Sequence, residues 1–383
     1  MMHPCPAPWR PTLCGSLLWL FCCASLAAPP CSQLTLTTRP WVAADRLFRQ
    51  DRRWLGGDGA ASVPLPSGDV LWLFGDSFVE PNGSGQRDRA ILVANTMAIQ
   101  HGRNPAVATM AFFWRLHKGL PAPYFPAAPG RRLWPMSAVA VGDKVLVALV
   151  ESCCHDAALL FRITGSRLVL LEPTPADPLS WRVRQLAIKR QHPGILLGAA
   201  ALHLGDRGAL YALSPEDQPP HAVHVARLDQ AAILAGKPVV PVGLRNPEGH
   251  GEVILRQGQV ELGLGRAASC WLVAMNGNVL GWRPMALGAS SILGPWHELV
   301  WQGLAITPPP GLLYALKVHP ELQGVPLVFT YASNTLDERR LLADQGYYYP
   351  RFLRAKVGPG LPQAAGWKVR TSPAALMGCV PLL

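Results

Sequence analysis

Two aspartates stand 18 positions apart among small residues. Asp58 lies in Gly-Gly-Asp-Gly, and Asp76 follows the apolar run "VLWLF" in Phe-Gly-Asp-Ser. The stretch "SVPLPSGDVLWLFGDS" between them predicts a strand, a tight turn and a second strand, and such a hairpin would bring both carboxyl groups together. Two neighbouring carboxyl groups can act as a general acid and as a base or nucleophile. The competing interpretation is that each aspartate accepts backbone N–H bonds and shapes a turn.

Short apolar segments bounded by Gly, Pro, Asp or Asn run along the whole chain and predict strands. The clearest cover residues 69–77, 136–152, 198–214, 251–265 and 311–334. Equivalent strands recur roughly every 64 residues, which leaves room for five units of four strands with generous loops. Because ring closure removes exposed strand edges, we expect an all-β, five-bladed β-propeller, with a pair of β-sandwiches as the alternative.

The N-terminus has the pattern of a secretory signal. Arg10 precedes an uncharged apolar stretch over residues 13–26, and Ser25-Leu26-Ala27 offers small residues for cleavage. We therefore expect a signal peptide over residues 1–27, one propeller domain over 28–383, and a secreted or periplasmic protein. An uncleaved anchor is the alternative for this segment. No later stretch has the length and apolarity of a membrane span.

Five of the nine cysteines follow the predicted cleavage point. A disulfide between Cys31 and Cys379 would join the two ends of a ring. The vicinal pair Cys153-Cys154, followed by His155 and Asp156, lacks a second set of spaced ligands, so no metal site is predicted there. No organic cofactor is expected, and a structural ion in the central channel stays open.

The formal net charge is +11, and the basic residues are scattered rather than gathered in a stripe. A scattered pattern argues against nucleic-acid binding, and neither a P-loop nor a GxGxxG pattern is present. An acidic cell-surface polymer is a better electrostatic match for a secreted basic protein.

The segments "GGDGAASVPLPSGDVLWLFGDSFV" and "ANTMAIQ" (94–100) closely resemble the opening blade of secreted propeller proteins in domain-of-unknown-function families 4185 and 5005. Part of that group is classed as glycoside hydrolase family 183, the endo-D-arabinofuranases, and the wider five-bladed group includes families 43 and 117. Later segments agree more loosely: "LWPMSAVAV" for a second blade, "HVARL" for a third, "GEVIL" and "SSILGPWHE" for a fourth, and "YALKVHP", "FTYASN" and "YYYPRFLRAKV" for a fifth.

The resemblance implies that Asp58 and Asp76 are catalytic. Glu252, which begins the strand "EVIL" of the expected fourth blade, is a rival to Asp58, because related hydrolases place an acid in a later blade. Asn95 matches the Asn of the family pattern and would bind a sugar hydroxyl or hold Asp76 in place. Four further residues are candidates for sugar binding, with core packing as the alternative for the aromatic ones: Trp134, Tyr331, Asn334 and Arg351.

The leading hypothesis is a secreted, monomeric glycoside hydrolase that cleaves an extracellular or cell-envelope polysaccharide, such as the furanoside arabinan. A carbohydrate-binding propeller without catalysis and a protein-interaction propeller are the alternatives. Catalysis requires both carboxyl groups to face one site about 5–10 Å apart. The sequence leaves open which carboxyl group is the acid, and whether the sugar configuration is retained or inverted.

Overall fold

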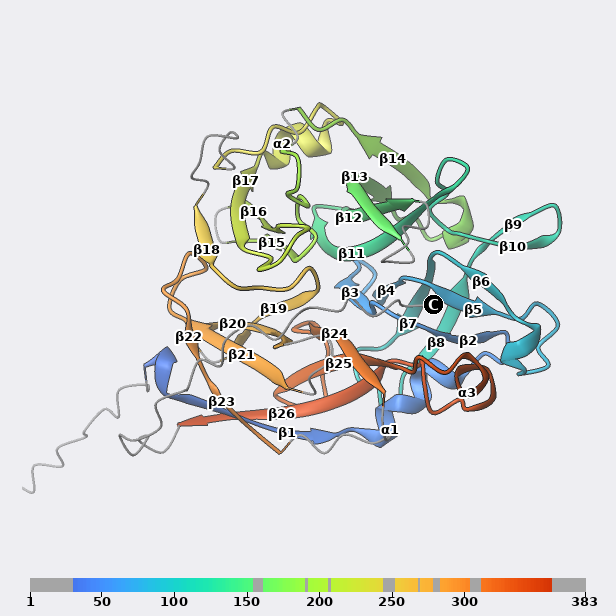
Figure 1. Cartoon of the computed structure of the whole chain (residues 1–383). Coiled ribbons are helices and arrows are strands. Elements are labelled where there is room, and N and C mark those ends of the chain that lie inside the picture. Colours follow the sequence, from blue (N-terminus) through green and yellow to red (C-terminus); the bar gives the residue numbers. More distant parts are fainter. Residues whose placement is uncertain are drawn as a thin grey trace, which may run out of the picture.

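The computed structural model describes residues 30–153, 161–189, 192–205, 208–243, 252–267, 269–277, 283–303 and 311–359 (Figure 1). Within these ranges β-strands dominate, so the fold is all-β as predicted. The α-helices there are short: α1 (Val42–Asp45), α2 (Gln230–Leu234) and α3 (Glu338–Ala343). Short 3-10 helices are η1 (Cys31–Gln33), η2 (Arg46–Arg49), η3 (Arg87–Arg89) and η4 (Pro178–Ser180). No helix in the described ranges has the length and apolarity needed to cross a bilayer. The predicted signal peptide, residues 1–27, lies outside these ranges.

Over the described residues, five sheets of four or five strands carry most of the strands, and we number them along the chain. The first sheet contains β3 (Ala61–Pro64), β4 (Val70–Phe74), β7 (Thr96–His101) and β8 (Thr109–Phe113). The second contains β11 (Arg131–Val141), β12 (Lys144–Cys153), β13 (Arg162–Glu172) and β14 (Arg182–Leu186). The third contains β15 (Ala201–Leu204), β16 (Leu210–Pro215), β17 (Val223–Leu228) and β18 (Val253–Leu255).

The fourth sheet contains β19 (Leu262–Ala267), β20 (Cys270–Asn276), β21 (Pro284–Ala289) and β22 (His297–Glu298). The fifth has the order β23 (Val300–Gln302), β1 (Leu34–Pro40), β26 (Arg351–Pro359), β25 (Leu327–Asn334) and β24 (Leu312–Val318). Two smaller sheets lie beside the first: β2 (Trp54–Gly57), β5 (Ser77–Val79) and β6 (Ile91–Val93) in one, and β9 (Arg115–His117) and β10 (Leu120–Ala122) in the other.

One strand of each sheet lies toward the middle of the molecule, and these inner strands are β3, β11, β15, β19 and β24 (Figure 1). Strand β11 contacts both β3 and β15, and β19 contacts β15 and β24. The sheets therefore follow one another side by side around a common centre.

Successive side chains along a strand point to opposite faces of the sheet, so the two faces of each sheet belong to different hydrophobic cores. In β12, Val145, Val147 and Leu149 pack against the first sheet, whereas Leu146 and Ala148 pack against the third. Further clusters join the third sheet to the fourth and the fourth to the fifth. Because each middle sheet is covered on both faces, its strands have the continuous apolar runs seen in the sequence.

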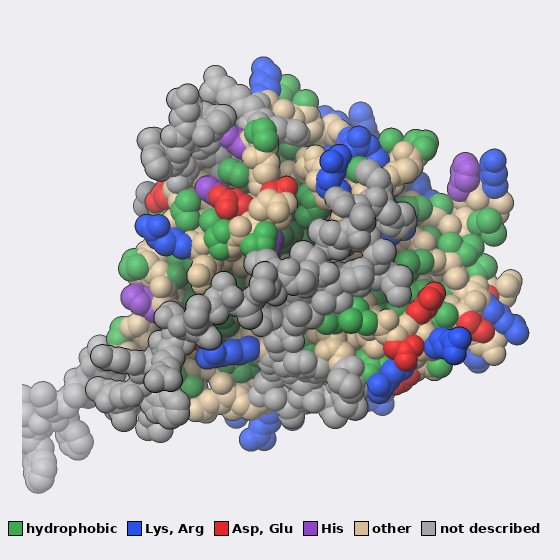
Figure 2. All heavy atoms as spheres, in the orientation of Figure 1, with side chains coloured by type: hydrophobic (Ala, Val, Ile, Leu, Met, Phe, Trp, Pro, Cys, Tyr) green, Lys and Arg blue, Asp and Glu red, His purple; other side chains and the backbone are tan. Residues whose placement is uncertain are grey.

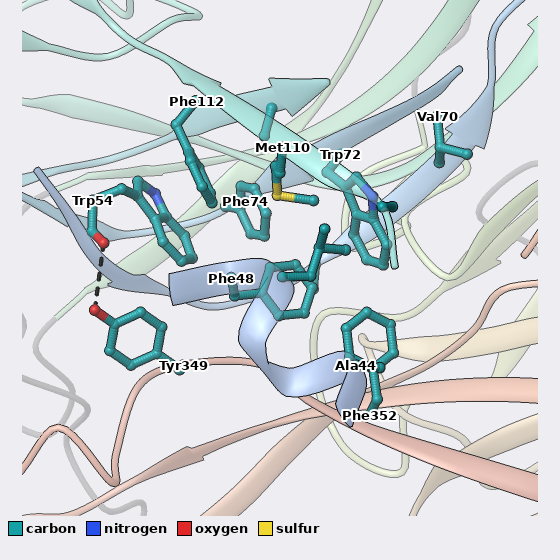
Figure 3. Packing of buried hydrophobic residues seen from close by; sticks show 14 of the residues in the cluster. Ala44, Phe48, Trp54, Val70, Trp72, Phe74, Met110, Phe112, Tyr349 and Phe352 are labelled. Atoms are coloured by element: carbon teal, nitrogen blue, oxygen red, sulfur yellow. Dashed lines mark hydrogen bonds between the residues drawn. The ribbon is translucent and has the colours of Figure 1, made fainter. Parts of the chain in front are cut away.

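A fifth cluster joins the fifth sheet back to the first (Figure 3). Phe48 from η2 stacks on Phe352 of β26 with ring centroids 4.9 Å apart, and it meets Trp72 of β4 edge-on at 5.1 Å. Trp54 of β2 stacks on Phe112 of β8 at 4.5 Å, and its carbonyl accepts the Tyr349 hydroxyl at 3.4 Å. These large aromatic side chains pack in the core, as the sequence allows for its aromatic residues.

The N-terminal strand β1 is incorporated between late elements of the chain. It pairs antiparallel with β26 and parallel with β23. Cys31, just before β1, forms a disulfide with Cys270 at the start of β20. The expected pairing of Cys31 with Cys379 is therefore wrong, because β1 is held beside the fourth sheet. Residues 154–156 of the cysteine-rich stretch lie outside the described ranges, as does Cys379.

Four of the predicted apolar segments belong to hairpins. Strand β3 pairs with β4, β11 with β12, β15 with β16, and β24 with β25. Residues 251–265 do not form one, because β18 is the outermost strand of the third sheet and β19 the innermost strand of the fourth. The local pattern of two apolar runs separated by polar residues does not distinguish a hairpin from a connection between neighbouring sheets.

Charged side chains are dispersed over the face drawn in Figure 2, with acidic and basic groups interspersed. This agrees with the scatter of basic residues along the sequence.

Candidate active site

The β3–β4 hairpin brings Asp58 and Asp76 side by side. Asp58 stands between β2 and the inner strand β3, and Asp76 directly follows Gly75 after β4. The N–H of Asp58 donates to the carbonyl of Asp76 at 3.3 Å, and the N–H of Gly75 donates to the carbonyl of Asp58 at 2.9 Å. The two backbone segments thus hold the two carboxyl groups at one end of the hairpin.

Glycines are required around the aspartates because other protein atoms lie very close to the glycine Cα atoms. A Cβ atom on Gly75 would lie 2.3 Å from Oδ1 of Asp58, which is far inside van der Waals contact. Gly56 has φ +119°, and a Cβ there would lie 2.6 Å from the carbonyl oxygen of Tyr348. The Gly-Gly-Asp-Gly and Phe-Gly-Asp patterns therefore leave room for a carboxyl group and for a distant segment of the chain.

Two phenol groups hold Asp58. Tyr314 of β24 and Tyr348, between α3 and β26, donate their hydroxyls to Oδ2 of Asp58 at 3.0 Å and 3.3 Å. Burial and the negative charges of Asp76 and Glu261 raise the pKa of Asp58 well above its ordinary value, and the two phenol donors oppose this only in part. Burial and the charge of Asp58 also raise the pKa of both tyrosines, so each keeps its proton and donates it.

Asp76 has a different set of partners. Its Oδ1 accepts the indole N–H of Trp134 at 2.9 Å, and its Oδ2 lies 3.6 Å from a guanidinium nitrogen of Arg132. Burial raises the pKa of Asp76 to about 6, while Trp134 and Arg132 favour the ionised form. Asp76 therefore gives up its proton more readily than Asp58. The side chain of Asp76 keeps 14% of its surface exposed, so it remains accessible.

A third acid, Glu261, completes the cluster. It precedes the inner strand β19 as Asp58 precedes β3. Burial raises the pKa of Glu261, while the charge of Lys317 and a hydrogen bond from the N–H of Ala315 lower it. Glu261 is not among the acids predicted from the sequence. The signal that would have found it is an acidic residue directly before a Gly-alternating inner strand, in "ELGLG".

A β-bulge in β24 positions three polar groups in and around this cluster. The register between β24 and β25 shifts between Tyr314 and Lys317, and Ala315 has φ +52°. Around this irregularity the hydroxyl of Tyr314 reaches Asp58, the N–H of Ala315 reaches Glu261, and Lys317 turns toward neighbouring sheets. Such bulges often redirect side chains beside functional sites.

Glu252 does not reach the cluster. It is exposed and lies at the edge of β18, the outermost strand of the third sheet. Its expected place in the fourth blade is wrong, because β18 belongs to the third sheet, and the acid that precedes the inner strand of the fourth sheet is Glu261.

Asn95 is buried and holds a loop of the chain. Its amide N–H groups donate to the carbonyls of Phe125 and Leu133 at 3.1 Å and 2.8 Å, and its Oδ1 accepts the N–H of Phe125 at 2.7 Å. The sequence suggested a contact with sugar or with Asp76, whereas the structure places the side chain on the segment that leads to Trp134.

The other predicted sugar-binding residues divide into two groups. Trp134 lies in the site, hydrogen-bonded to Asp76 and packed edge-on against Phe161 at 4.8 Å. The other three residues lie in the fifth sheet and are not among the side chains that bond to the three acids in the described residues: Tyr331, Asn334 and Arg351. Tyr331 and Asn334 are buried, Tyr331 is paired across strands with Arg351, and Arg351 donates to the carbonyl of Gly346 at 2.8 Å.

The three-acid cluster is separate from a cavity of about 620 Å³ that lies beside α2 in the third sheet. Its carboxylate, Asp229, caps α2 by accepting the N–H of Ala232 at 3.1 Å. That arrangement accounts for the acid without any ligand, in contrast to the three-acid cluster.

The chain belongs to the family described as domain of unknown function DUF5005, whose sequence pattern matches residues 43–236. This range includes Asp58 and Asp76 and ends before Glu261. No curated protein sequence was found to match the chain.

Solved structures with a similar fold include a provisionally assigned hydrolase from Bacteroides ovatus ATCC 8483, with a TM-score of 0.64 and 16% identity, covering 83% of this chain and 90% of that one. An alpha-L-arabinofuranosidase from Lactobacillus brevis has a TM-score of 0.45 and 14% identity, over 80% of this chain and 92% of the other. A GH43_1 enzyme from Xanthomonas citri complexed with xylotriose has a TM-score of 0.44 and 14% identity, over 83% and 93%. The first of these supports the all-β fold described above.

Proposed function

We propose that this protein is a glycoside hydrolase in which Asp58 is the general acid and Asp76 is the base or nucleophile. The observation that carries the proposal is that two adjacent carboxyl groups have opposite surroundings. Among the residues that the structure describes, Asp58 faces two other acids and no cation, whereas Asp76 has an indole donor and a guanidinium. Pairs of carboxyl groups driven apart in pKa are the arrangement that glycosidic cleavage uses.

The chemistry follows from the protonation states. Asp58, whose pKa is raised well above its ordinary value by burial and two neighbouring acids, donates a proton to the glycosidic oxygen as the bond to the anomeric carbon breaks. Asp76, ionised above about pH 6, either takes a proton from an attacking water or attacks the anomeric carbon itself. The face of Trp134 beside Asp76 supplies an apolar surface on which a sugar ring can stack.

We further propose that the fold is a five-bladed β-propeller. Five sheets with inner strands around one centre, and core clusters that lead from the first sheet through the fifth and back to the first, support this architecture. A ring of this kind places acids that precede β3 and β19, together with the residue that follows β4, around one end of its axis.

The proposed substrate is an extracellular or cell-envelope polysaccharide containing furanosides, such as arabinan. The signal pattern at the N-terminus and the positive net charge support a secreted or periplasmic protein that meets such polymers.

The test is a screen of arabinans and other polysaccharides for released reducing sugar. Asp58→Asn and Asp76→Asn should each lower the rate by about 10²–10⁴-fold, because each removes a proton-transfer or nucleophilic group. Asp69→Asn is the matched control, since Asp69 lies in the turn at the other end of the same hairpin, bonded to Ser67. Full activity in both site variants would overturn the proposal. Sugar binding by the wild type without turnover of any polymer would instead favour the carbohydrate-binding alternative.

A further inference from the structure

Two cations accompany the three acids. Arg132 lies beside Asp76 with its guanidinium half exposed, and Lys317 is buried near Glu261. Within the described residues, the groups that face Asp58 are Asp76, Glu261 and the two phenols, and no cation is among them. Two of the three acids thus have a positive neighbour and the third does not.

The ammonium group of Lys317 reaches from the fifth sheet to two others. Lys317 is only 5% exposed, and its Nζ donates to the carbonyl of Met136 in β11 at 2.9 Å and to that of Leu262 in β19 at 3.4 Å. Leu262 directly follows Glu261. The N–H of Ala315, two residues before Lys317, is bonded to the Glu261 carboxyl group. One bulge therefore fixes both the position of Glu261 and the cation near it.

Stability alone does not account for a lysine at this position. Transferring an ammonium group from water to a buried site is costly, and an apolar side chain of similar length would fill the same space without that cost. Lys317 finds two carbonyl acceptors for its three N–H groups. Its charge, rather than its volume, is the property that distinguishes it from such a replacement.

We propose that Lys317 is a positioning residue that keeps Glu261 ionised and thereby leaves the proton of the acid cluster on Asp58. This rests on the proposed function, because it assigns the proton that the hydrolase would donate. Glu261 faces Lys317, the N–H of Ala315, Asp58 and Tyr314, so Lys317 is the single cation among the charged and titratable groups recorded around it in the described residues.

Loss of the Lys317 charge should lower the pH at which Asp58 gives up its proton. Without the cation, Glu261 holds its own proton to higher pH and becomes neutral. Its negative charge then no longer favours the protonated form of Asp58, whose proton is lost at lower pH. In the described part of the chain, the carboxyl group that Lys317 faces is that of Glu261, so the effect on Asp58 passes through Glu261.

The experiment is a carboxyl NMR titration of protein labelled with carbon-13 at aspartate and glutamate side chains, which needs no substrate. In the wild type, Glu261 should titrate at lower pH than Asp58. Lys317→Met and Glu261→Gln should each lower the midpoint of Asp58 by about one pH unit, a tenfold change in proton affinity. The double variant should lower it no further. Lys144→Met is the matched control, because Lys144 forms an ion pair with Glu172 at 3.5 Å at the far end of β12.

Two results would overturn the inference. One is a wild-type titration in which Glu261 holds its proton above Asp58, a result that needs no variant to fold. The other is a folded Lys317→Met protein in which Asp58 titrates as in the wild type. If the titrations behave as expected but no polysaccharide is cleaved, the proposed hydrolase function fails while the assignment of charge within the cluster stands.

Discussion

At the scale of residues, surroundings rather than residue type separate two aspartates that are neighbours. Asp58 is held by phenols and lies among acids, whereas Asp76 has Trp134 and Arg132. The proposed function therefore assigns two roles to one residue type, proton donor at Asp58 and ionised group at Asp76.

The first prediction concerns the pH dependence of hydrolysis. Because burial raises the pKa of Asp76 to about 6, the rate at limiting substrate should fall below about pH 6, tenfold per pH unit, as Asp76 takes up a proton. The fall at high pH should follow loss of the proton from Asp58. Measurement of kcat/KM from pH 4 to 9 checks both limbs. A low-pH limb centred near 4, as for an ordinary carboxyl group, would contradict the role of Asp76.

The second prediction concerns stability. A raised pKa in the folded state means that the folded protein binds the Asp76 proton more tightly than the unfolded chain does. The stabilisation from that proton is complete below about pH 4 and is lost as pH rises through about 6. Asp76→Asn removes the charge, so at pH 7.5 it should increase the free energy of unfolding by about 3 kcal/mol, and at pH 3.5 by little.

Urea unfolding of the wild type and Asp76→Asn at both pH values measures this difference. Asp69→Asn serves again as the control within the same hairpin. Equal free energies of unfolding of the wild type and Asp76→Asn at pH 7.5 would contradict the prediction, because the ionised carboxyl group would then cost no folding free energy.

At the scale of elements, the β3–β4 hairpin and the bulge in β24 build the site. Gly75 lets the hairpin close over Asp58, since a Cβ there would lie 2.3 Å from Oδ1. Gly75→Ala should therefore displace the carboxyl group and lower the rate of hydrolysis about 100-fold. Gly358→Ala is the control, because a Cβ at that position in β26 meets open space. Unchanged activity in Gly75→Ala would mean that the position of Asp58 is not critical.

The sequence predicts local elements of this site better than distant ones. The hairpin between Asp58 and Asp76 follows from two short apolar runs and a turn, which are adjacent in the chain. Tyr314 and Tyr348 lie 256 and 290 positions from Asp58 and carry no local signal of that contact. Glu252 and Glu261 both precede apolar runs, and only the order of strands within a sheet shows that one is at the rim and the other at the centre.

At the scale of the whole molecule, contacts between the first and last strands of the described residues support the site. Strand β1 lies between β26 and β23, and the disulfide between Cys31 and Cys270 ties the segment just before β1 to the fourth sheet across 239 residues. Arg87 adds a further link, since its guanidinium donates to the carbonyls of Leu55 and Tyr347 and so joins β2 to the segment that carries Tyr348.

Removal of the disulfide should therefore cost stability without changing the chemistry. The double variant Cys31→Ser with Cys270→Ser should lose about 2–4 kcal/mol of unfolding free energy, because a long loop in the unfolded chain is released. Thermal unfolding measures the loss, and peptide mapping by mass spectrometry identifies the linked cysteines. A disulfide-linked peptide pairing Cys31 with Cys379 would contradict this arrangement.

If Asp58 donates the proton and Asp76 does not, the two variants should differ in how the rate of hydrolysis depends on the leaving group. The measurement compares hydrolysis of the natural polymer with that of a dinitrophenyl glycoside of the same sugar, whose leaving group needs no proton. Asp58→Asn should lose about 10²–10⁴-fold on the polymer and retain most of its activity on the dinitrophenyl glycoside, whereas Asp76→Asn should lose activity on both. Equal losses of Asp58→Asn on the two substrates would contradict the assignment.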